Sequence, residues 1–295
     1  MELRSMEAIR RVSEETGKAL WEIVLETDMD DRMVSRESSM EKMRQIWRAM
    51  VDASEIYTGS RRSSSGMAGG DGLKMRQYAE AGDTIGGSFT AEVIAEALAM
   101  GESNACMRRI VAAPTAGSCG TMPAVLLPLC RREQIPEDKM LEALYAAAGI
   151  AAVIASRACI SGAAGGCQAE VGSASAMAAG ALVTLRGGSF DQICQAVAMA
   201  LKMVLGLACD PVAGLVEVPC IKRNVMGAMN AIAAADMALA GIRSQIPVDE
   251  VIDAMGEVGR RLPVELRETA LGGLAATPTG KAVKKRLRQI TGVKS

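Results

Sequence analysis

The chain of 295 residues contains no histidine, and aromatic residues make up only 2% of it. Without histidine, this chain alone builds no Ser-His-Asp triad, no Cys-His pair and no histidine-ligated zinc or haem site. Acid–base chemistry near neutral pH therefore needs carboxylates, Lys, Cys, Tyr, metal-bound water or a second chain. Because 49% of the residues are nevertheless hydrophobic, the core must consist of Ala, Val, Ile, Leu and Met.

The sequence also lacks a charge excess, a disulfide framework and an apolar run of membrane length. Its 33 Lys and Arg balance 34 Asp and Glu, whereas a nucleic-acid-binding chain is typically basic. Eight cysteines are too sparse for a disulfide scaffold. The uncharged, alanine-rich runs 143–156 and 171–185 fall short of the roughly 20 residues of a membrane helix. We therefore expect a cytoplasmic protein with no nucleic-acid or membrane partner.

Composition divides the chain into an N-terminal helical segment (1–57), a loop rich in glycine and serine (58–72) and a longer helical region (73–295). We expect these to form one structural domain. Apolar residues spaced three and four apart between 40 and 50 predict an amphipathic helix, with Ser39 as a candidate N-cap. For the loop, composition alone favours a flexible linker, although its glycines also suit an anion-binding loop.

Alanine and glycine dominate 85–245, where strand-forming residues are sparse and do not alternate. Since alanine is the best helix former, we predict a mainly α-helical fold in which small residues pack closely. Only 111–129 leaves helix or strand open. Further along, Pro247 and Asp249 predict a helix start, and the basic residues of 281–288 predict a solvated helix face.

Glycine density rises in four stretches: 65–72, 113–120, 161–172 and 206–214. In a helical chain, such loops suit helix N-termini that face a bound group. None contains the Gly-Lys-Ser/Thr of a phosphate-binding loop, and none fits the dinucleotide fingerprint after a clear strand. The sequence therefore predicts no nucleotide cofactor.

Three cysteines stand at breaks between helical stretches: Cys167 follows two glycines, Cys209 precedes an Asp-Pro pair, and Cys220 follows a proline. Thiolates on rigid turns bind soft metals and iron–sulfur clusters. Because no Cys-x-x-Cys occurs, their spacing alone leaves a metal site as one interpretation among others. The remaining cysteines lie mostly in apolar runs, where Cys behaves as a small hydrophobe: Cys106, Cys119, Cys130, Cys159 and Cys194.

Two long motifs around these cysteines strongly resemble the alpha chain of the iron–sulfur-dependent L-serine dehydratases. They read SGAAGGCQAEVGSAS at 161–175 and CDPVAGLVEVPCIKRN at 209–224. Three shorter stretches, 113–118, 230–241 and 274–280, extend the resemblance over nearly the whole chain. The first segment shows it least.

This resemblance implies that Cys167, Cys209 and Cys220 hold a 4Fe–4S cluster with one open iron, on which the glycine-rich loops converge. The open iron would act as a Lewis acid on the hydroxyl of L-serine, whose dehydration gives pyruvate and ammonia. Pyridoxal phosphate is not expected, because no phosphate loop accompanies a candidate Schiff-base lysine. Two alternatives stay open: a related lyase acting on L-cysteine or another β-substituted amino acid, and a non-catalytic helical partner subunit.

The resemblance also implies a set of substrate-binding candidates: Ser65, Gly69, Gly70, Asp71, Ser118, Ser161, Gly162, Lys222, Arg223 and Asn224. Backbone geometry or capping is the alternative role for each. The last three follow Cys220 and are expected to meet the substrate carboxylate, whereas Ala68 stands where the family pattern has Thr. The catalytic base is not identified. Asp71, Lys222 and a residue of the separate beta chain, with which such alpha chains form an oligomer, are all candidates.

Overall fold

Helices form throughout the computed structural model, which describes residues 3–291 of the chain. No strand occurs within these residues, where a single isolated β-bridge joins Cys209 to Arg267. The prediction of a mainly α-helical fold is therefore confirmed. The ends of the first and last predicted segments, 1–2 and 292–295, lie outside the described residues.

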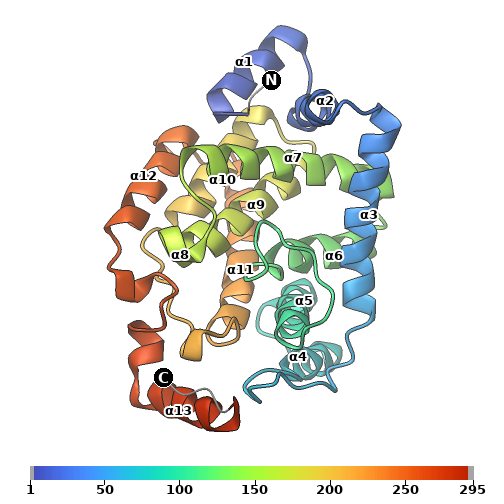
Figure 1. Ribbon diagram of the computed structural model, residues 1–295. Coiled ribbons are helices and arrows are strands. Elements are labelled where there is room, and N and C mark those ends of the chain that lie inside the picture. Colours follow the sequence, from blue (N-terminus) through green and yellow to red (C-terminus); the bar gives the residue numbers. More distant parts are fainter. Residues whose placement is uncertain (1–2, 292–295) are drawn as a thin grey trace.

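Thirteen α-helices and four short helical turns follow one another along the described part of the chain (Figure 1). The α-helices are α1 (Met6–Thr16), α2 (Leu20–Arg32), α3 (Arg36–Glu55), α4 (Asp71–Glu80), α5 (Gly87–Ala105), α6 (Thr121–Glu133), α7 (Glu137–Arg157), α8 (Gly162–Gly165), α9 (Ser173–Leu185), α10 (Phe190–Lys202), α11 (Cys220–Leu239), α12 (Val248–Arg261) and α13 (Pro278–Thr291). The turns are the π-helical η1 (Gln168–Gly172) and the 3-10 turns η2 (Val212–Gly214), η3 (Val264–Leu266) and η4 (Gly273–Ala276).

Helix α9 lies at the centre of the bundle, where α6, α7, α10 and α11 pack around it (Figure 1). Its sequence SASAMAAGALVTL presents small side chains in every direction, and its residues from Ser173 to Val183 are buried. Gly180 approaches α7 so closely that a Cβ there would lie 2.2 Å from Cδ1 of Ile150. Close helix approach of this kind lets a core with few aromatic rings reach the packing density of a protein interior.

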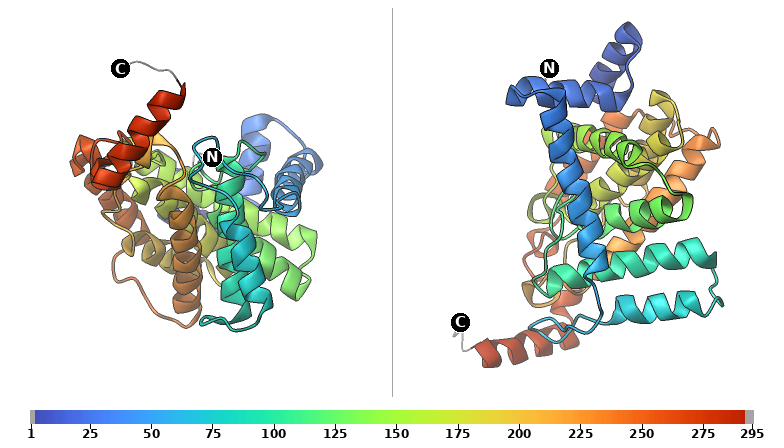
Figure 2. Two further views of the ribbon diagram at one scale, coloured as in Figure 1. Left: turned by 90° about the horizontal axis from the view of Figure 1, so that it is seen from below. Right: turned by 90° about the vertical axis from the view of Figure 1, so that its right-hand side faces the viewer.

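Helix α3 runs along one side of the molecule, with Trp47 buried against the core as the apolar spacing predicts (Figure 2). Its start differs from the prediction. The helix begins at Arg36, and the side chain of Ser35 accepts the capping hydrogen bond. Ser39 is fully buried within the helix, and its hydroxyl contacts that of Tyr145 at 2.6 Å. The N-cap prediction for Ser39 is therefore wrong, because the helix extends further toward the N-terminus than its apolar stripe indicates.

The glycine- and serine-rich segment 58–72 is a loop only as far as Gly70, since α4 begins at Asp71, and this loop is fixed to the rest of the protein. Ser63 and Ser65 are buried, and both hydroxyls donate to Oε2 of Glu217 at 2.7 Å. Arg286 of α13 donates to the carbonyl of Ser65 at 3.1 Å. The glycine content of this segment favours a flexible linker. Composition does not reveal the partners Glu217 and Arg286, which lie more than 150 residues away in the sequence.

The remaining sequence expectations concern three stretches. Within 111–129, which the sequence leaves open, a loop is followed by the start of α6 at Thr121. Helix α12 begins directly after Pro247, as predicted. The basic residues of 281–288 lie on α13, which sits at one end of the molecule beside η2 and η4 (Figure 2). Among the described helices, only α7 is long and apolar enough to cross a membrane, and 61% of its apolar window is buried inside the protein.

Candidate metal centre

Three of the four glycine-rich loops meet at one buried place. Gly117 of the second loop lies against the third loop, because a Cβ on it would be 2.6 Å from Oε1 of Glu170. Gly162 of the third loop lies against the fourth, because a Cβ there would be 3.0 Å from Sγ of Cys209. Only residues without a side chain permit these approaches, which accounts for the glycine density.

The three cysteines predicted as ligands are all buried around this place. Cys167 directly precedes η1, Cys209 forms the β-bridge with Arg267, and Cys220 is the first residue of α11. Sγ of Cys167, Sγ of Cys209 and a carboxylate oxygen of Glu170 all lie within 4.8 Å of one another. These three atoms form a group that could hold a metal ion.

The protonation of these thiols is mutually dependent. Cys209 donates its S–H to Cys167, which lowers the pKa of Cys167, and the guanidinium of Arg223 acts in the same direction. The same hydrogen bond, together with burial, raises the pKa of Cys209. Burial raises the pKa of Cys220 to about 12, and the charges of Cys167 and Glu170 add to this shift. A metal ion bound here would replace protons on the sulfurs, since only thiolates bind metals well.

Glu170 belongs to this group but is not among the site residues predicted from the sequence. It lies in η1, and π-helical turns are rare features that often occur at functional sites. Its Oε1 accepts a hydrogen bond from the hydroxyl of Thr115 at 2.5 Å. Burial raises the pKa of Glu170, and the nearby carboxylate of Glu268 raises it further. Its spacing of three residues from Cys167 was the available signal, because such residues share one side of a helical turn.

Arg223 is the cation beside the thiols, and it is held by a buried partner. Its guanidinium lies 2.7 Å from Oδ1 of Asp210 and donates to the carbonyl of Ala208 at 2.8 Å. The other oxygen of Asp210 accepts from the amide of Leu274 at 2.7 Å. Gly273 lets the backbone come this close, since a Cβ there would be 2.2 Å from Oδ2. The ion pair thus joins α11, the loop before η2 and the turn η4.

The other two residues of the Lys-Arg-Asn run face different surroundings. Asn224 is buried, accepts from the amide of Gly120 at 2.9 Å and donates to the carbonyl of Gly117 at 2.8 Å. It therefore holds the second glycine loop against the first turn of α11. Lys222 is 60% exposed and forms an ion pair with Asp71 at 2.6 Å.

Two predicted serines lie in the loops that form the centre. Ser118 is fully buried, and its hydroxyl contacts that of Thr115 at 3.0 Å. Ser118 therefore contacts the Thr115 hydroxyl, which donates a hydrogen bond to Glu170. Ser161 is exposed and makes no capping hydrogen bond to α8, although it directly precedes Gly162.

The first glycine loop surrounds a different buried carboxylate, that of Glu102. Gly69 and Gly70 adopt φ angles of 126° and 83°, which favour glycine. The loop thereby directs the amides of Asp71 and Gly72 onto Glu102, at 2.7 and 3.3 Å. The N-terminus of α4 is thus occupied by an anion that the chain itself supplies.

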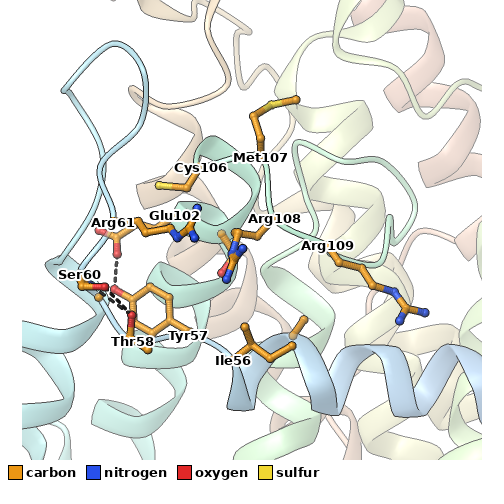
Figure 3. A pocket seen from close by; sticks show the side chains of 13 residues that line it. Ile56, Tyr57, Thr58, Ser60, Arg61, Glu102, Cys106, Met107, Arg108 and Arg109 are labelled. Carbon is orange, nitrogen blue, oxygen red and sulfur yellow. Dashed lines mark hydrogen bonds between the residues drawn. The ribbon is translucent and has the colours of Figure 1, made fainter.

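A pocket of about 460 Å³ lies beside Glu102 (Figure 3). The hydroxyl of Tyr57 donates to Glu102 at its floor. Arg61 and Arg108 lie next to Glu102, whereas Arg109 points away from it (Figure 3). All three arginines are exposed, and no ion pair of theirs occurs within residues 3–291. In this pocket, both oxygens of the Glu102 carboxylate already accept hydrogen bonds from the chain, whereas the three arginines carry positive charges without an ion-pair partner among the described residues.

Replacing Glu102 by glutamine is expected to lower the free energy of unfolding by about 1–3 kcal/mol, because the new amide N–H would face groups that donate to the carboxylate now. Urea unfolding of the variant measures the loss. Glu92→Gln is the matched control, since Glu92 lies exposed on the same helix. Equal stability of the two variants would contradict this role of Glu102.

Comparison with known families matches residues 15–275 to the family described as the serine dehydratase alpha chain. The chain is 44% identical over 284 residues to the probable L-serine dehydratase alpha chain of Bacillus subtilis, covering 96% of this chain and 95% of that one. It is 41% identical to the L-serine dehydratase alpha chain of Peptoniphilus asaccharolyticus, covering 96% and 97%. With L-serine dehydratase 1 of Escherichia coli it shares 46% identity over 181 residues, covering 61% and 40%. The resemblance found in the motifs is confirmed.

Proposed function

Because the chain belongs to the serine dehydratase alpha chain family, we propose that it is the catalytic chain of an L-serine ammonia-lyase. Loss of water from L-serine, followed by hydrolysis of the resulting enamine, yields pyruvate and ammonia. The observation that carries this proposal is the grouping of Cys167, Glu170 and Cys209 within 4.8 Å, formed by the loops in which the family motifs lie.

The proposed cofactor is a 4Fe–4S cluster bound by Cys167, Cys209 and Cys220, with one iron not held by cysteine. The donors present fit such a group, because two thiols and a carboxylate lie within 4.8 Å of one another, and the nearby cation, Arg223, is already paired. The third thiol, Cys220, is buried and close enough for the charges of Cys167 and Glu170 to raise its pKa. Soft thiolates are the ligands that iron–sulfur clusters select. When bound, the cluster supplies a Lewis acid for the serine hydroxyl.

Residues of the chain would position the amino acid beside the thiols. Gly117 and Gly162 carry no side chain, so the backbone approaches the centre directly. Asp71 and Lys222, the two candidates for the catalytic base in this chain, form an ion pair with each other. A residue of the beta chain is the third candidate. The predicted contacts with substrate remain proposals for all ten candidates.

The Lys222→Met variant tests the proposed contact with the substrate carboxylate. Loss of a charged hydrogen bond is expected to raise KM for L-serine roughly tenfold. Lys74→Met is the matched control, because Lys74 pairs with the same Asp71 carboxylate at 3.2 Å and is not a predicted substrate contact. Steady-state kinetics of both variants decide the matter: an unchanged KM in Lys222→Met excludes the contact.

We also propose a separate beta chain as partner, an oligomer of both chains and a cytoplasmic location. The beta chain is supported by the comparisons. This chain matches two relatives named alpha chains over nearly their full length, but it covers only 40% of the Escherichia coli enzyme. The contacts of Ser65 with Glu217 and with Arg286 support one structural domain across the predicted segments. No membrane or nucleic-acid partner is proposed.

The deciding experiment is anaerobic purification with iron and sulfide analysis, followed by a pyruvate assay with and without the beta chain. We expect about four irons per chain and pyruvate from L-serine in preference to L-cysteine. Faster turnover of L-cysteine would favour the related lyase instead. Two results together would identify a non-catalytic subunit: the chain binds no cluster after anaerobic reconstitution, and the beta chain is equally active without it.

A further inference from the structure

The pocket beside Glu102 has no role in the proposed chemistry. None of the residues that line it is among the ten predicted substrate contacts, and none belongs to the three glycine-rich loops that form the metal centre. The ends of α3 and α5 and the loop between α3 and α4 form its walls (Figure 3). Its volume of about 460 Å³ lies within the roughly 300–1,000 Å³ of small-molecule sites. The pocket therefore has room for a small ligand of its own.

The residues that line this pocket carry a positive net charge. Their charged members are three arginines (Arg61, Arg108 and Arg109) and one carboxylate. That carboxylate belongs to Glu102, so the net charge of the lining is +2 (three minus one). Tyr57 adds no charge, because burial and its hydrogen bond to Glu102 raise the pKa of its hydroxyl. Two positive charges therefore remain uncompensated at the pocket.

Two of the three arginines lie where a ligand in the pocket would meet them. Arg61 and Arg108 lie next to Glu102, whereas the third arginine points away (Figure 3). Both oxygens of Glu102 already accept hydrogen bonds from other groups of the chain. Elsewhere on the surface arginines pair with carboxylates, as Arg186 does with Glu133 at 2.7 Å. Within residues 3–291 the two guanidinium groups of the pocket have no such partner.

The main chain holds both arginines in place. Helix α5 ends in a closed turn, in which Met107 adopts a φ angle of 56° and the amide of Arg108 donates to the carbonyl of Ser103 at 2.8 Å. The carbonyl of Arg61 packs so closely against Gly69 that a Cβ on this glycine would overlap it. Because both main chains are ordered without a ligand, binding between the two side chains costs less conformational entropy than binding by a mobile loop.

The charge of the pocket favours one class of ligand. Guanidinium groups bind the oxygens of carboxylates and phosphates through paired N–H donors. A small dianion matches the net charge of +2, whereas L-serine has no net charge and carries an ammonium group that the guanidinium groups repel. The pocket therefore suits a dianion better than it suits the substrate of the proposed reaction.

We propose that this pocket binds a small dianion, either a phosphate group or a dicarboxylate, between the guanidinium groups of Arg61 and Arg108. The inference does not depend on the cluster or on serine dehydration. A bound dianion would join the end of α5 to the loop between α3 and α4. This loop also carries the predicted substrate contacts Ser65, Gly69 and Gly70, so the ligand would order the main chain that leads to them.

The test is isothermal titration calorimetry of the full chain, purified without oxygen, with inorganic phosphate, malonate and L-serine in turn at low ionic strength. We expect saturable binding of at least one of the two dianions. Arg61→Met and Arg108→Met should each weaken it at least about tenfold, because each removes a charge-assisted hydrogen bond. Circular dichroism checks that the variants fold.

Arg260→Met is the matched control. Arg260 is exposed on α12, does not line the pocket and forms no ion pair within the described residues. Its replacement removes the same charge elsewhere and should change the affinity by no more than about twofold. An equal loss in Arg260→Met, or unchanged binding in both pocket variants, would overturn the inference, as would the absence of binding of either dianion.

The remaining outcomes identify the ligand or exclude a separate site. Tighter binding of phosphate indicates a phosphorylated ligand, and tighter binding of malonate indicates a dicarboxylate. Competition by L-serine would make the pocket part of the substrate site and contradict the proposal. The same titration of the complex with the beta chain covers the remaining case: loss of binding there would show that the pocket is a protein contact instead. Failure of the proposed function is separate, because it would show as absence of a cluster or of pyruvate formation in the unchanged chain.

Discussion

Cys209→Ala protein, purified and reconstituted without oxygen, is expected to retain roughly a tenth or less of the iron of the unchanged chain. Pyruvate formation should fall to background with it. The reason is that Cys209 is buried at the point where three glycine-rich loops meet, so no solvent ligand replaces the lost sulfur. The same result is expected for Cys167→Ala and Cys220→Ala. Iron analysis and a pyruvate assay on each variant measure both effects.

Cys194→Ala is the control for this series. Cys194 lies on α10, outside the grouped donors, and burial raises the pKa of its thiol to about 12. It is therefore a protonated packing residue, and its replacement should leave iron content unchanged. Full iron retention in Cys209→Ala, or an equal loss in Cys194→Ala, would refute the assignment of the ligands.

Removal of Arg223 is the second change with a large expected effect. Its side chain and that of Asp210 are only 15% and 7% exposed, and they lie 2.7 Å apart. Arg223→Met leaves the Asp210 charge buried without its cation, which is expected to lower the free energy of unfolding by about 3–5 kcal/mol. Anaerobic denaturant unfolding of the iron-free chain measures this loss.

Two further variants isolate the cause. Removing both charges, in Asp210→Asn with Arg223→Met, is expected to recover part of the stability, since no uncompensated charge stays buried. The neighbouring Lys222→Met breaks a pair that is 60% and 37% exposed and should change stability by no more than about 1 kcal/mol. A double variant less stable than Arg223→Met alone would show that packing, rather than the buried charge, dominates.

Local patterns in the sequence predict the helices well, and sequence motifs single out the three cysteines of the proposed metal centre. Alanine content and apolar spacing are properties of neighbouring residues, so α9 and α12 follow from them directly. The three cysteines emerge from the resemblance of their motifs, and all three are buried around one place. The predicted start of α3 is wrong because its first turn, from Arg36, precedes the apolar stripe, so Ser35 and not Ser39 caps the helix.

The rest of the site depends on contacts between distant residues. Glu170 acquires its place from Thr115, 55 positions earlier in the sequence, and from glycines in two loops. Likewise, the Gly-Gly-Asp loop has the composition of an anion site, yet the anion is Glu102 of α5. Neither pairing leaves a periodic or compositional signal, because a single hydrogen bond between loops constrains only the two residues that make it.

The β-bridge that closes the Cys209 loop has a consequence for the order of biogenesis. The amide of Cys209 donates to the carbonyl of Leu266 at 2.8 Å, and its carbonyl accepts from Glu268 at 2.7 Å. Asp210 additionally needs the amide of Leu274. Since a chain emerges from the ribosome N-terminus first, all three cysteines are made before the segment that fixes Cys209 exists. The turn that carries Cys209 is therefore fixed only after residue 274 has been made, and the proposed metal centre can form only after that point.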